Sequence, residues 1–313
     1  MGVTITQMTD DHLSQVLQVW DRAFVGRTHD FQIDRAGFTE RVLNRPCYKP
    51  EGCLVALDGS DPVGLAIVAA PDEGDEGFLS AVLVDPEYQA RGIGTKLLEA
   101  AETFLSACGK TEVKIGYRGN PISFCIGVDL STPAHRFLLN RGYRNRGSAS
   151  LFMTNSLEDF ELSDEIRAYT RENATQGVQF GLCEEAHRAA LCRFMEEQFP
   201  GGWEQSVKGV LEGDPPYSVL VATDGPDVVG FTGPIRVSSS GRTSFTGIGT
   251  RPDYRRRKIG MVLFHLLCSG FRSRGGTSST LHTGLRNPAQ EIYFSAGYRV
   301  QYLVDYSLEK RLG

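Results

Sequence analysis

The chain has 313 residues, of which 41% are hydrophobic and 23% charged, and its net charge is −5. This composition is typical of globular proteins and excludes the collagen-like, low-complexity and disordered classes. The length predicts about two domains, the acidic balance argues against a general nucleic-acid binder, and no apolar run reaches the roughly 18 residues of a membrane span.

The first half of the chain alternates strand and helix patterns. The expected strands are residues 3–7, 53–57, 63–69, 78–84, 113–117 and 149–153, and the last of them closes the unit. The expected helices are residues 11–24, 35–43, 92–107 and 133–140.

The second half repeats this order of elements. The expected strands are residues 178–182, 218–223, 228–237, 243–249, 280–282 and 300–306. The expected helices are residues 184–199, 204–211, 259–272 and 288–295. Between the halves, the polar residues 156–177 are interpreted as a linker, with room for a short helix at residues 163–170.

Three matches in the same order indicate that the second half is a copy of the first. Residues 85–94 align with 251–260, residues 133–143 with 288–298, and the opening strand 3–7 with 178–182. We therefore expect two duplicated domains, residues 1–155 and 178–313, on either side of the linker.

The strongest motif joins an expected strand to an expected helix and reads Gln89-Ala90-Arg91-Gly92-Ile93-Gly94. Glycines let a backbone approach a ligand closely, and a helix N-terminus offers free N–H groups and partial positive charge. The segment is therefore suited to a pyrophosphate. It is not a P-loop, and Leu97 stands where a dinucleotide fingerprint needs its third glycine.

This pattern, Q/R-x-x-G-x-G/A after a strand, resembles the acyl-CoA loop of the Gcn5-related N-acetyltransferase (GNAT) superfamily. The later segments Asn287-Pro288-Ala289, Tyr293 and Ala296-Gly297-Tyr298 also resemble that family. The resemblance covers nearly the whole chain as two tandem copies. It implies an α/β fold in which each domain has a mixed, mostly antiparallel sheet flanked by helices, with acyl-CoA between its separated fourth and fifth strands.

The resemblance also implies which residues contact acyl-CoA, although the strand positions are equally compatible with plain sheet core. In the first copy these residues are Val82, Leu83, Val84, Gln89, Ala90, Arg91, Gly92, Ile93, Gly94 and Thr95. In the second copy they are Ile248, Gly249, Thr250, Arg255, Arg256, Arg257, Lys258, Ile259, Gly260 and Asn287.

The two copies depart from the family pattern in complementary ways. The first copy has both loop glycines, but Leu138 stands where the second copy has Tyr293. The second copy has Lys258 in place of the first loop glycine, which adds positive charge but also a bulky side chain. The run of basic residues before Lys258 also resembles a nucleic-acid patch, but its place after a strand favours binding of the CoA phosphates.

The resemblance implies that Tyr293 protonates the departing CoA thiolate. A phenol with a reference pKa of about 10 is a suitable donor to a thiolate whose reference pKa is about 8.5. The alternative is a tyrosine that only packs on its helix. Asn287 has two interpretations as well, as a cofactor contact or as the cap of the helix that begins at Pro288.

The acceptor amine must lose a proton before it attacks, a task usually given to a carboxylate acting through water. The sequence assigns no particular base. The acidic residues 72–76 either attract a cationic acceptor or form a solvated hairpin turn. Phe199 and Trp203 flank a Pro-Gly-Gly turn and either line an apolar acceptor pocket or pack inward.

The sequence shows no metal-binding pattern. Its seven cysteines are irregularly spaced and include no C-x-x-C pair: Cys47, Cys53, Cys108, Cys125, Cys183, Cys192 and Cys268. This spacing predicts free thiols in a reducing compartment and argues against structural zinc. No signal peptide is recognised at the amino terminus, so we expect a cytoplasmic location.

These observations predict an N-acetyltransferase that moves an acetyl group from acetyl-CoA to a primary amine by direct attack. The acceptor is a small-molecule or peptide amine, and no metal, nucleic acid or membrane is expected to take part. We expect a monomer, because two copies in one chain replace the homodimer that single copies often form. The alternative is a non-catalytic acyl-CoA-binding or sensor protein with a degenerate second domain.

Overall fold

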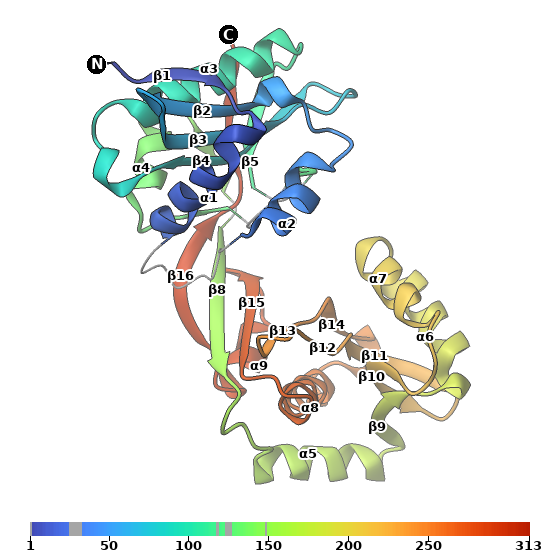
Figure 1. Cartoon of the computed structure of the whole chain (residues 1–313). Helices are drawn as coiled ribbons and strands as arrows, with labels where there is room; N and C mark the ends of the chain where they lie inside the picture. Colours follow the sequence, from blue (N-terminus) through green and yellow to red (C-terminus); the bar gives the residue numbers. More distant parts are fainter. Residues whose placement is uncertain (1, 25–32, 117–118, 123–126, 148) are drawn as a thin grey trace. The chain divides into compact units, whose positions relative to one another are not determined.

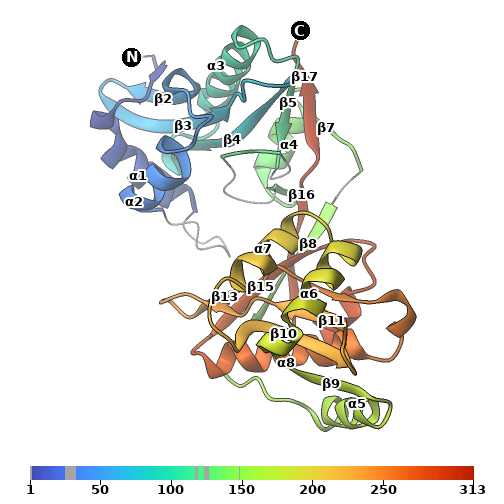
Figure 2. The same ribbon diagram turned by 90° about the vertical axis from the view of Figure 1, so that its right-hand side faces the viewer.

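The computed structural model describes residues 2–24, 33–116, 119–122, 127–147 and 149–313. The chain forms two compact units, one made of Met1–Leu151 together with Tyr302–Gly313 and the other of Phe152–Gln301 (Figures 1 and 2). Both contain sheets flanked by helices, which confirms the expected α/β class. Tyr117, at the end of an expected strand, and Cys125 lie outside the described residues.

The first unit is built on a seven-stranded sheet in the order β1-β2-β3-β4-β5-β17-β7. Its strands are β1 (Thr4–Gln7), β2 (Cys53–Asp58), β3 (Asp61–Ala69), β4 (Glu76–Val84), β5 (Glu112–Ile115), β7 (Arg144–Asn145) and β17 (Leu308–Arg311). Its helices are α1 (Asp10–Phe24), α2 (Arg35–Phe38), α3 (Ile93–Ala107) and α4 (Pro133–Leu139), and α2 continues as a π-helical turn, Thr39–Leu43.

Helices cover both faces of this sheet, because successive side chains of its central strands point to opposite sides. On one face Trp20 of α1 packs in a fully buried cluster with Leu65 and Ile67 of β3. On the other face Leu97 of α3 packs with Ala66. The two hydrophobic clusters fix the positions of α1 and α3 on β3 and β4.

The strand that completes the first sheet comes from the end of the chain. β17 pairs antiparallel with both β5 and β7, and its Leu308 is completely buried. The expectation that residues 149–153 close this sheet is corrected, because β8 (Ala149–Ser156) lies in another sheet between β15 and β16. The local pattern of β8 predicts a strand but carries no information about its partner.

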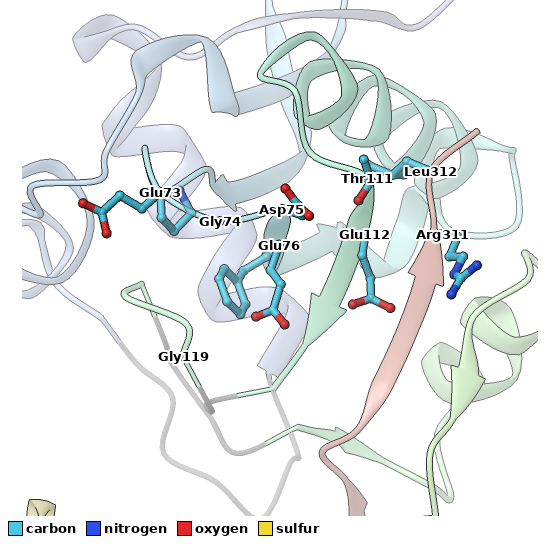
Figure 3. A pocket seen from close by; sticks show the side chains of 11 residues that line it. Glu73, Gly74, Asp75, Glu76, Thr111, Glu112, Gly119, Arg311 and Leu312 are labelled. Atoms are coloured by element: carbon cyan, nitrogen blue, oxygen red, sulfur yellow. The ribbon is translucent and has the colours of Figure 1, made fainter.

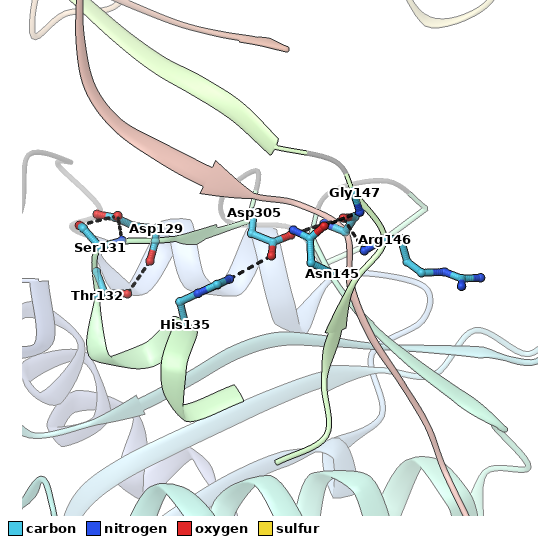
Figure 4. A network of polar contacts seen from close by, with 9 residues as sticks. Asp129, Ser131, Thr132, His135, Asn145, Arg146, Gly147 and Asp305 are labelled. Atoms are coloured by element: carbon cyan, nitrogen blue, oxygen red, sulfur yellow. Dashed lines mark hydrogen bonds and ion pairs between the residues drawn. The ribbon is translucent and has the colours of Figure 1, made fainter. Parts of the chain in front are cut away.

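A polar network in the first unit holds the turn that leads into β17 (Figure 4). The Asp305 carboxylate is completely buried and lies 3.0 Å from Nε2 of His135 on α4. Its Oδ1 accepts a hydrogen bond from the backbone N–H of Ser307 at 3.0 Å. Arg146, which directly follows β7, forms an ion pair with Glu309 of β17 at 2.6 Å. Contacts from α4 and from Arg146 therefore hold the turn that leads into β17.

The second unit contains helices α5 (Asp164–Thr175), α6 (Glu185–Gln198), α7 (Gly202–Val210), α8 (Ile259–Ser273) and α9 (Gln290–Ser295). Its strands are β9 (Val178–Cys183), β10 (Tyr217–Asp224), β11 (Asp227–Gly233), β12 (Arg236–Val237), β13 (Arg242–Ser244), β14 (Gly247–Thr250) and β15 (Ser278–Gly284). The strand β16 (Arg299–Asp305) begins in this unit, and its residues from Tyr302 on belong to the first. One sheet has the order β14-β11-β10-β9, and the other β12-β13-β15-β8-β16-β6, where β6 is Val128–Asp129.

The expected domain limits need two corrections. Residues 302–313, expected in the second domain, belong to the first unit because β17 pairs there. Much of the expected linker 156–177 is helix α5, which begins where the Ser163 hydroxyl accepts a hydrogen bond from Ile166 N–H at 3.3 Å. Asn173 of α5 is buried and donates to the carbonyl of Arg257 at 2.9 Å, so the helix is part of the second unit.

His265 of α8 makes the stability of the second unit sensitive to acid. Burial lowers the pKa of His265 to about 4, so the unfolded chain binds this proton first as the pH falls. Stability is therefore present above pH 6.5 and lost between pH 6.5 and 4, by on the order of 3 kcal/mol. Urea unfolding at several pH values should give a flatter pH dependence for His265→Gln than for the wild type. Identical slopes would contradict this assignment.

Candidate functional site

The central strand β4 of the first unit is paired along only part of one edge. It pairs with β3 from Phe78 to Val84, but its parallel pairing with β5 is limited to Glu76, Gly77 and Phe78. Beyond Phe78 no described strand pairs with that edge. Residues 80–84 are half-buried, although they belong to a strand in the middle of a sheet. The two strands therefore diverge, and beyond Phe78 this edge of β4 has no strand partner among the described residues for its backbone N–H and C=O groups.

A β-bulge marks the point where β4 and β5 separate. Ile67 of β3 pairs with Ala81 and the next residue pairs with Leu79, so Ser80 is the extra residue on β4. The Ser80 hydroxyl donates to Asn120 Oδ1 at 3.2 Å. A bulge redirects the backbone at one residue, and such features are common beside active sites.

The motif loop follows β4 and ends at the first turn of α3. Ala90 and Gly92 both adopt left-handed backbone conformations, with φ of +60° and +79°. The Gln89 side chain donates to the Val84 carbonyl at 3.1 Å, which folds the loop over the end of β4. Helix α3 has no side-chain cap, so its first N–H groups remain available to an anion.

The space beside this loop is open. A Cβ atom added to Gly92 would meet no atom within 4 Å. A Cβ on Gly94, in contrast, would lie 3.4 Å from the ring of Phe137 on α4 and 3.7 Å from Val84. Gly92 therefore leaves room on the outer side of the loop, and Gly94 lets α4 and β4 approach the helix closely. Both properties fit a bound pyrophosphate.

Two charged residues support this loop, and neither was recognised from the sequence. The buried Asp85 accepts hydrogen bonds from Arg22 of α1 at 2.7 Å and from the N–H of Glu87 at 3.0 Å. Arg141 stacks 3.7 Å from the ring centroid of Phe137 and donates to the Thr95 hydroxyl in the first turn of α3. Arg141 thus adds positive charge beside the proposed anion cradle.

The second loop has the same backbone shape despite its different sequence. Arg256 and Lys258 have φ of +65° and +61°, and they match Ala90 and Gly92. Helix α8 also begins without a side-chain cap. The Lys258 ammonium lies 5.7 Å from the ring centroid of Tyr169 on α5. Lysine at this position therefore preserves the loop conformation and places a cation beside it.

The basic residues of the second loop divide into two groups. Arg257 stacks on Tyr254 at 4.7 Å, and its carbonyl accepts a hydrogen bond from Asn173. Arg255 and Arg256 are exposed and make no ion pair within the described part of the chain. All three arginines are exposed, and the ring of Tyr254 orients the guanidinium group of Arg257.

In the second unit the strand that corresponds to β4 is broken in two. β13 pairs parallel with β15, whereas β14 pairs with β11 alone and is the last strand of its sheet. Ile248, Gly249 and Thr250 are half-buried on this edge. The break replaces the bulge of the first unit, with Thr246 at the position of Ser80.

Phe199 and Trp203 pack on the glycines of β14. A Cβ on Gly249 would lie 2.1 Å from the ring of Phe199, and one on Gly247 would lie 2.6 Å from the ring of Trp203. Phe199 is half-buried, whereas 39% of Trp203 is exposed. The turn that carries Phe199 and Trp203 therefore packs against β14. One side of the Trp203 ring is exposed to solvent.

Tyr293 of α9 is nearly buried, with its ring 4.9 Å from that of Phe264 and 6.4 Å from that of Tyr298. Its hydroxyl has no hydrogen-bond partner among the described residues, and burial raises the pKa of Tyr293 to about 12. Asn287 accepts a hydrogen bond from the N–H of Ala289 at 3.0 Å in the turn before α9. The expectation that it caps a helix beginning at Pro288 is corrected, because α9 begins at Gln290 without a side-chain cap. The contact of Asn287 with a cofactor stays a prediction.

The acidic residues 72–76 of the first unit border a cavity of about 730 Å³ (Figure 3). Glu73, Asp75, Glu76 and Glu112 line it, with Arg311 of β17 as a cation in the same lining. Glu76 and Glu112 both form ion pairs with Lys114. The segment is therefore an exposed turn beside a cavity, and part of its charge is neutralised locally.

Within the described residues, no cluster of three or more His, Cys, Asp or Glu side chains has an arrangement that would hold a metal ion. The described cysteines are free thiols, and burial raises the pKa of Cys53 and Cys268 to about 12. None of the helices among the described residues combines the length and apolar character needed to cross a membrane.

Solved structures share this fold over nearly the whole chain. A glucosamine N-acetyltransferase region of a fungal multi-domain β-N-acetylglucosaminidase gives a TM-score of 0.73 at 20% identity, and the match covers 98% of this chain and 38% of that one. A GCN5-related N-acetyltransferase from Sphaerobacter thermophilus gives 0.68 at 15%, over 99% and 96% of the chains. A tandem GNAT protein from the clavulanic acid biosynthesis pathway gives 0.64 at 13%, over 100% and 99%.

A family match over both repeats identifies the chain as an acyltransferase. The family model described as the acetyltransferase (GNAT) family matches residues 13–123 and again residues 188–298. The chain therefore belongs to the GNAT family and carries two tandem copies of its domain. A search of curated proteins finds no match.

Proposed function

We propose that the protein transfers an acetyl group from acetyl-CoA to a primary amine of a small-molecule or peptide acceptor, by direct attack of the amine on the thioester. The observation that carries this proposal is the open edge of β4, which continues into the Gly92 loop and the uncapped start of α3. An extended pantetheine arm would pair with the edge as an added strand does, and a pyrophosphate would bind the loop N–H groups.

The first unit has the more complete cofactor site in this proposal. Val82, Leu83 and Val84 supply the strand edge, and the residues from Gln89 to Thr95 supply the cradle. The second unit would bind acetyl-CoA through Ile248, Gly249, Thr250 and the loop from Arg255 to Gly260. Its matching backbone conformation supports this assignment.

We place the chemistry in the second unit, because Tyr293 has no polar counterpart in the first. The raised pKa of Tyr293 keeps its hydroxyl protonated at neutral pH. The hydroxyl therefore remains able to donate a hydrogen bond to the departing CoA sulfur. In the first unit the matching residue, Leu138, is buried and has no proton to give.

Turnover with free-thiol detection tests the proposal. Acetyl-CoA is mixed with the protein and a panel of primary amines, and the products are checked by mass spectrometry. We expect thiol release that depends on an amine and matches the amount of acetylated product. Binding of CoA with no amine-dependent thiol release would count against the enzyme and for the non-catalytic alternative.

Replacing Gly92 by valine should weaken CoA binding at the first unit at least tenfold, or about 1.4 kcal/mol. The new side chain would fill the open space beside the loop, and a branched residue disfavours a φ of +79°. Isothermal titration calorimetry measures the affinity and the number of sites.

Gly59→Val is the matched control, because Gly59 has a φ of +66° and equally open surroundings in the turn between β2 and β3. The Gly59→Val variant introduces a similar backbone strain at a position outside the Gly92 loop. Unchanged stoichiometry and affinity in Gly92→Val would show that the first unit is not the principal CoA site.

A further inference from the structure

We propose that the second unit recognises an acceptor that carries a carboxylate as well as its amine, and that Arg236 binds this carboxylate. The inference rests on the proposed function, because it names the substrate class of the same site. Three elements carry it: helix α7, the break between β13 and β14, and strand β12.

Helix α7 presents two side chains to the break in the strand. Trp203 and Ser206 are three residues apart and therefore lie on one face of the helix. The Trp203 ring covers Gly247, and the Ser206 hydroxyl lies 2.6 Å from the Thr246 hydroxyl. One face of α7 thus combines an aromatic surface and a hydroxyl pair beside the strand edge assigned to the cofactor.

Arg236 adds a cation to this hydroxyl pair. Its Nη2 donates to Ser206 at 3.0 Å and its Nη1 lies 3.4 Å from the Thr246 hydroxyl. A guanidinium has five N–H donors in a planar fork, so these contacts orient it and leave donors unused. A carboxylate is the ligand that matches such a fork in two parallel hydrogen bonds.

No described residue of this chain neutralises the charge of Arg236. Arg236 is exposed and forms no ion pair within the residues that the structure describes. Glu204 on α7 is already engaged, since Lys208 lies 2.7 Å from its carboxylate and the N–H of Gly201 donates to it at 3.1 Å. Glu196 pairs with the same lysine at 2.7 Å. Glu196 and Glu204 thus have a partner of their own in Lys208.

The position of the cluster connects it with acyl transfer. Thr246 lies where the pairing with β15 has ended and the open edge of β14 begins, as Ser80 does at the bulge of the first unit. A carboxylate on Arg236, with the apolar part of the acceptor against Trp203, would hold the acceptor at the end of the gap assigned to acetyl-CoA.

The first test is acceptor preference. A panel of α- and ω-amino acids, each with its matching carboxamide, is assayed with acetyl-CoA. We expect the best acceptor to be an acid whose kcat/KM falls at least tenfold in Arg236→Gln, mainly through KM, while its amide changes little. Arg188→Gln removes an exposed charge from α6 of the same unit and should behave as the wild type. A best acceptor without a carboxylate would overturn the proposal.

The second test measures binding without turnover. The same acids and amides are titrated while indole fluorescence is recorded, and Trp203→Phe shows which part of the signal comes from Trp203. Acids should change the signal, amides should not, and Arg236→Gln should lose the response. A response to acids without acetylation would contradict only the proposed function. Acetylation of amines without any response to acids would contradict only the carboxylate site.

Discussion

Replacing Tyr293 by phenylalanine is expected to lower kcat about 100-fold, or about 2.7 kcal/mol in the barrier. The substitution removes the hydroxyl that would donate to the departing sulfur but keeps the ring that packs on Phe264 and Tyr298. The hydroxyl has no partner among the described residues, so its loss should cost little stability. Steady-state kinetics with the best acceptor and thermal unfolding measure the two effects.

Tyr298→Phe is the matched control, because Tyr298 belongs to the same aromatic cluster and donates to Ser279 at 2.5 Å. This variant should lose about 1 kcal/mol of stability from the broken hydrogen bond and keep its turnover. Full activity in Tyr293→Phe, together with loss of activity in the Gly92 variant, would move the active site to the first unit.

Ending the chain after Tyr306 should prevent the first unit from folding. The truncation removes β17 from between β5 and β7, and with it the completely buried Leu308. Loss of a buried leucine side chain alone costs about 2–5 kcal/mol, which is a large part of the stability of a typical domain. Calorimetric unfolding should lose the transition of the first unit, and the CoA site of that unit should disappear.

Two point variants test whether the truncated chain loses the first unit because the packing of Leu308 on β17 is lost. Leu308→Ala should destabilise the first unit by about 2–5 kcal/mol. Glu309→Gln lies on the same strand and breaks only the ion pair with Arg146, whose side chain is 70% exposed, so it should cost less than about 1 kcal/mol. A truncated chain with two intact transitions would show that β17 is dispensable.

The order of elements and both loops were predictable from the sequence because they depend on local patterns. Runs of apolar residues identify β3 and β4, and the internal repeat by itself aligns Gly92 with Lys258. The equal backbone shape of the two loops was not predictable, since a left-handed lysine is strained in isolation. Its neighbours hold it there, and Asn173 bonds the carbonyl just before it.

Local sequence patterns could not predict which strands pair in the sheets or which side chains meet in the site. Residues 149–153 read as a strand whichever sheet they join, and only long-range packing places Leu308 beside β5. Arg141 and Arg236 look like ordinary surface residues in the sequence. Their roles depend on Phe137 and Ser206, which come from other elements.

The place of β17 has a consequence for how the protein is made. Domains are generally completed in order during synthesis, with the amino-terminal one first. Here the first unit obtains its β17 strand from residues that follow the second unit in the chain, so its sheet stays incomplete until the whole second unit has emerged. The nascent chain must therefore carry an unfinished sheet edge at β5 throughout this period. A cut between the two repeats would therefore not release a complete amino-terminal unit.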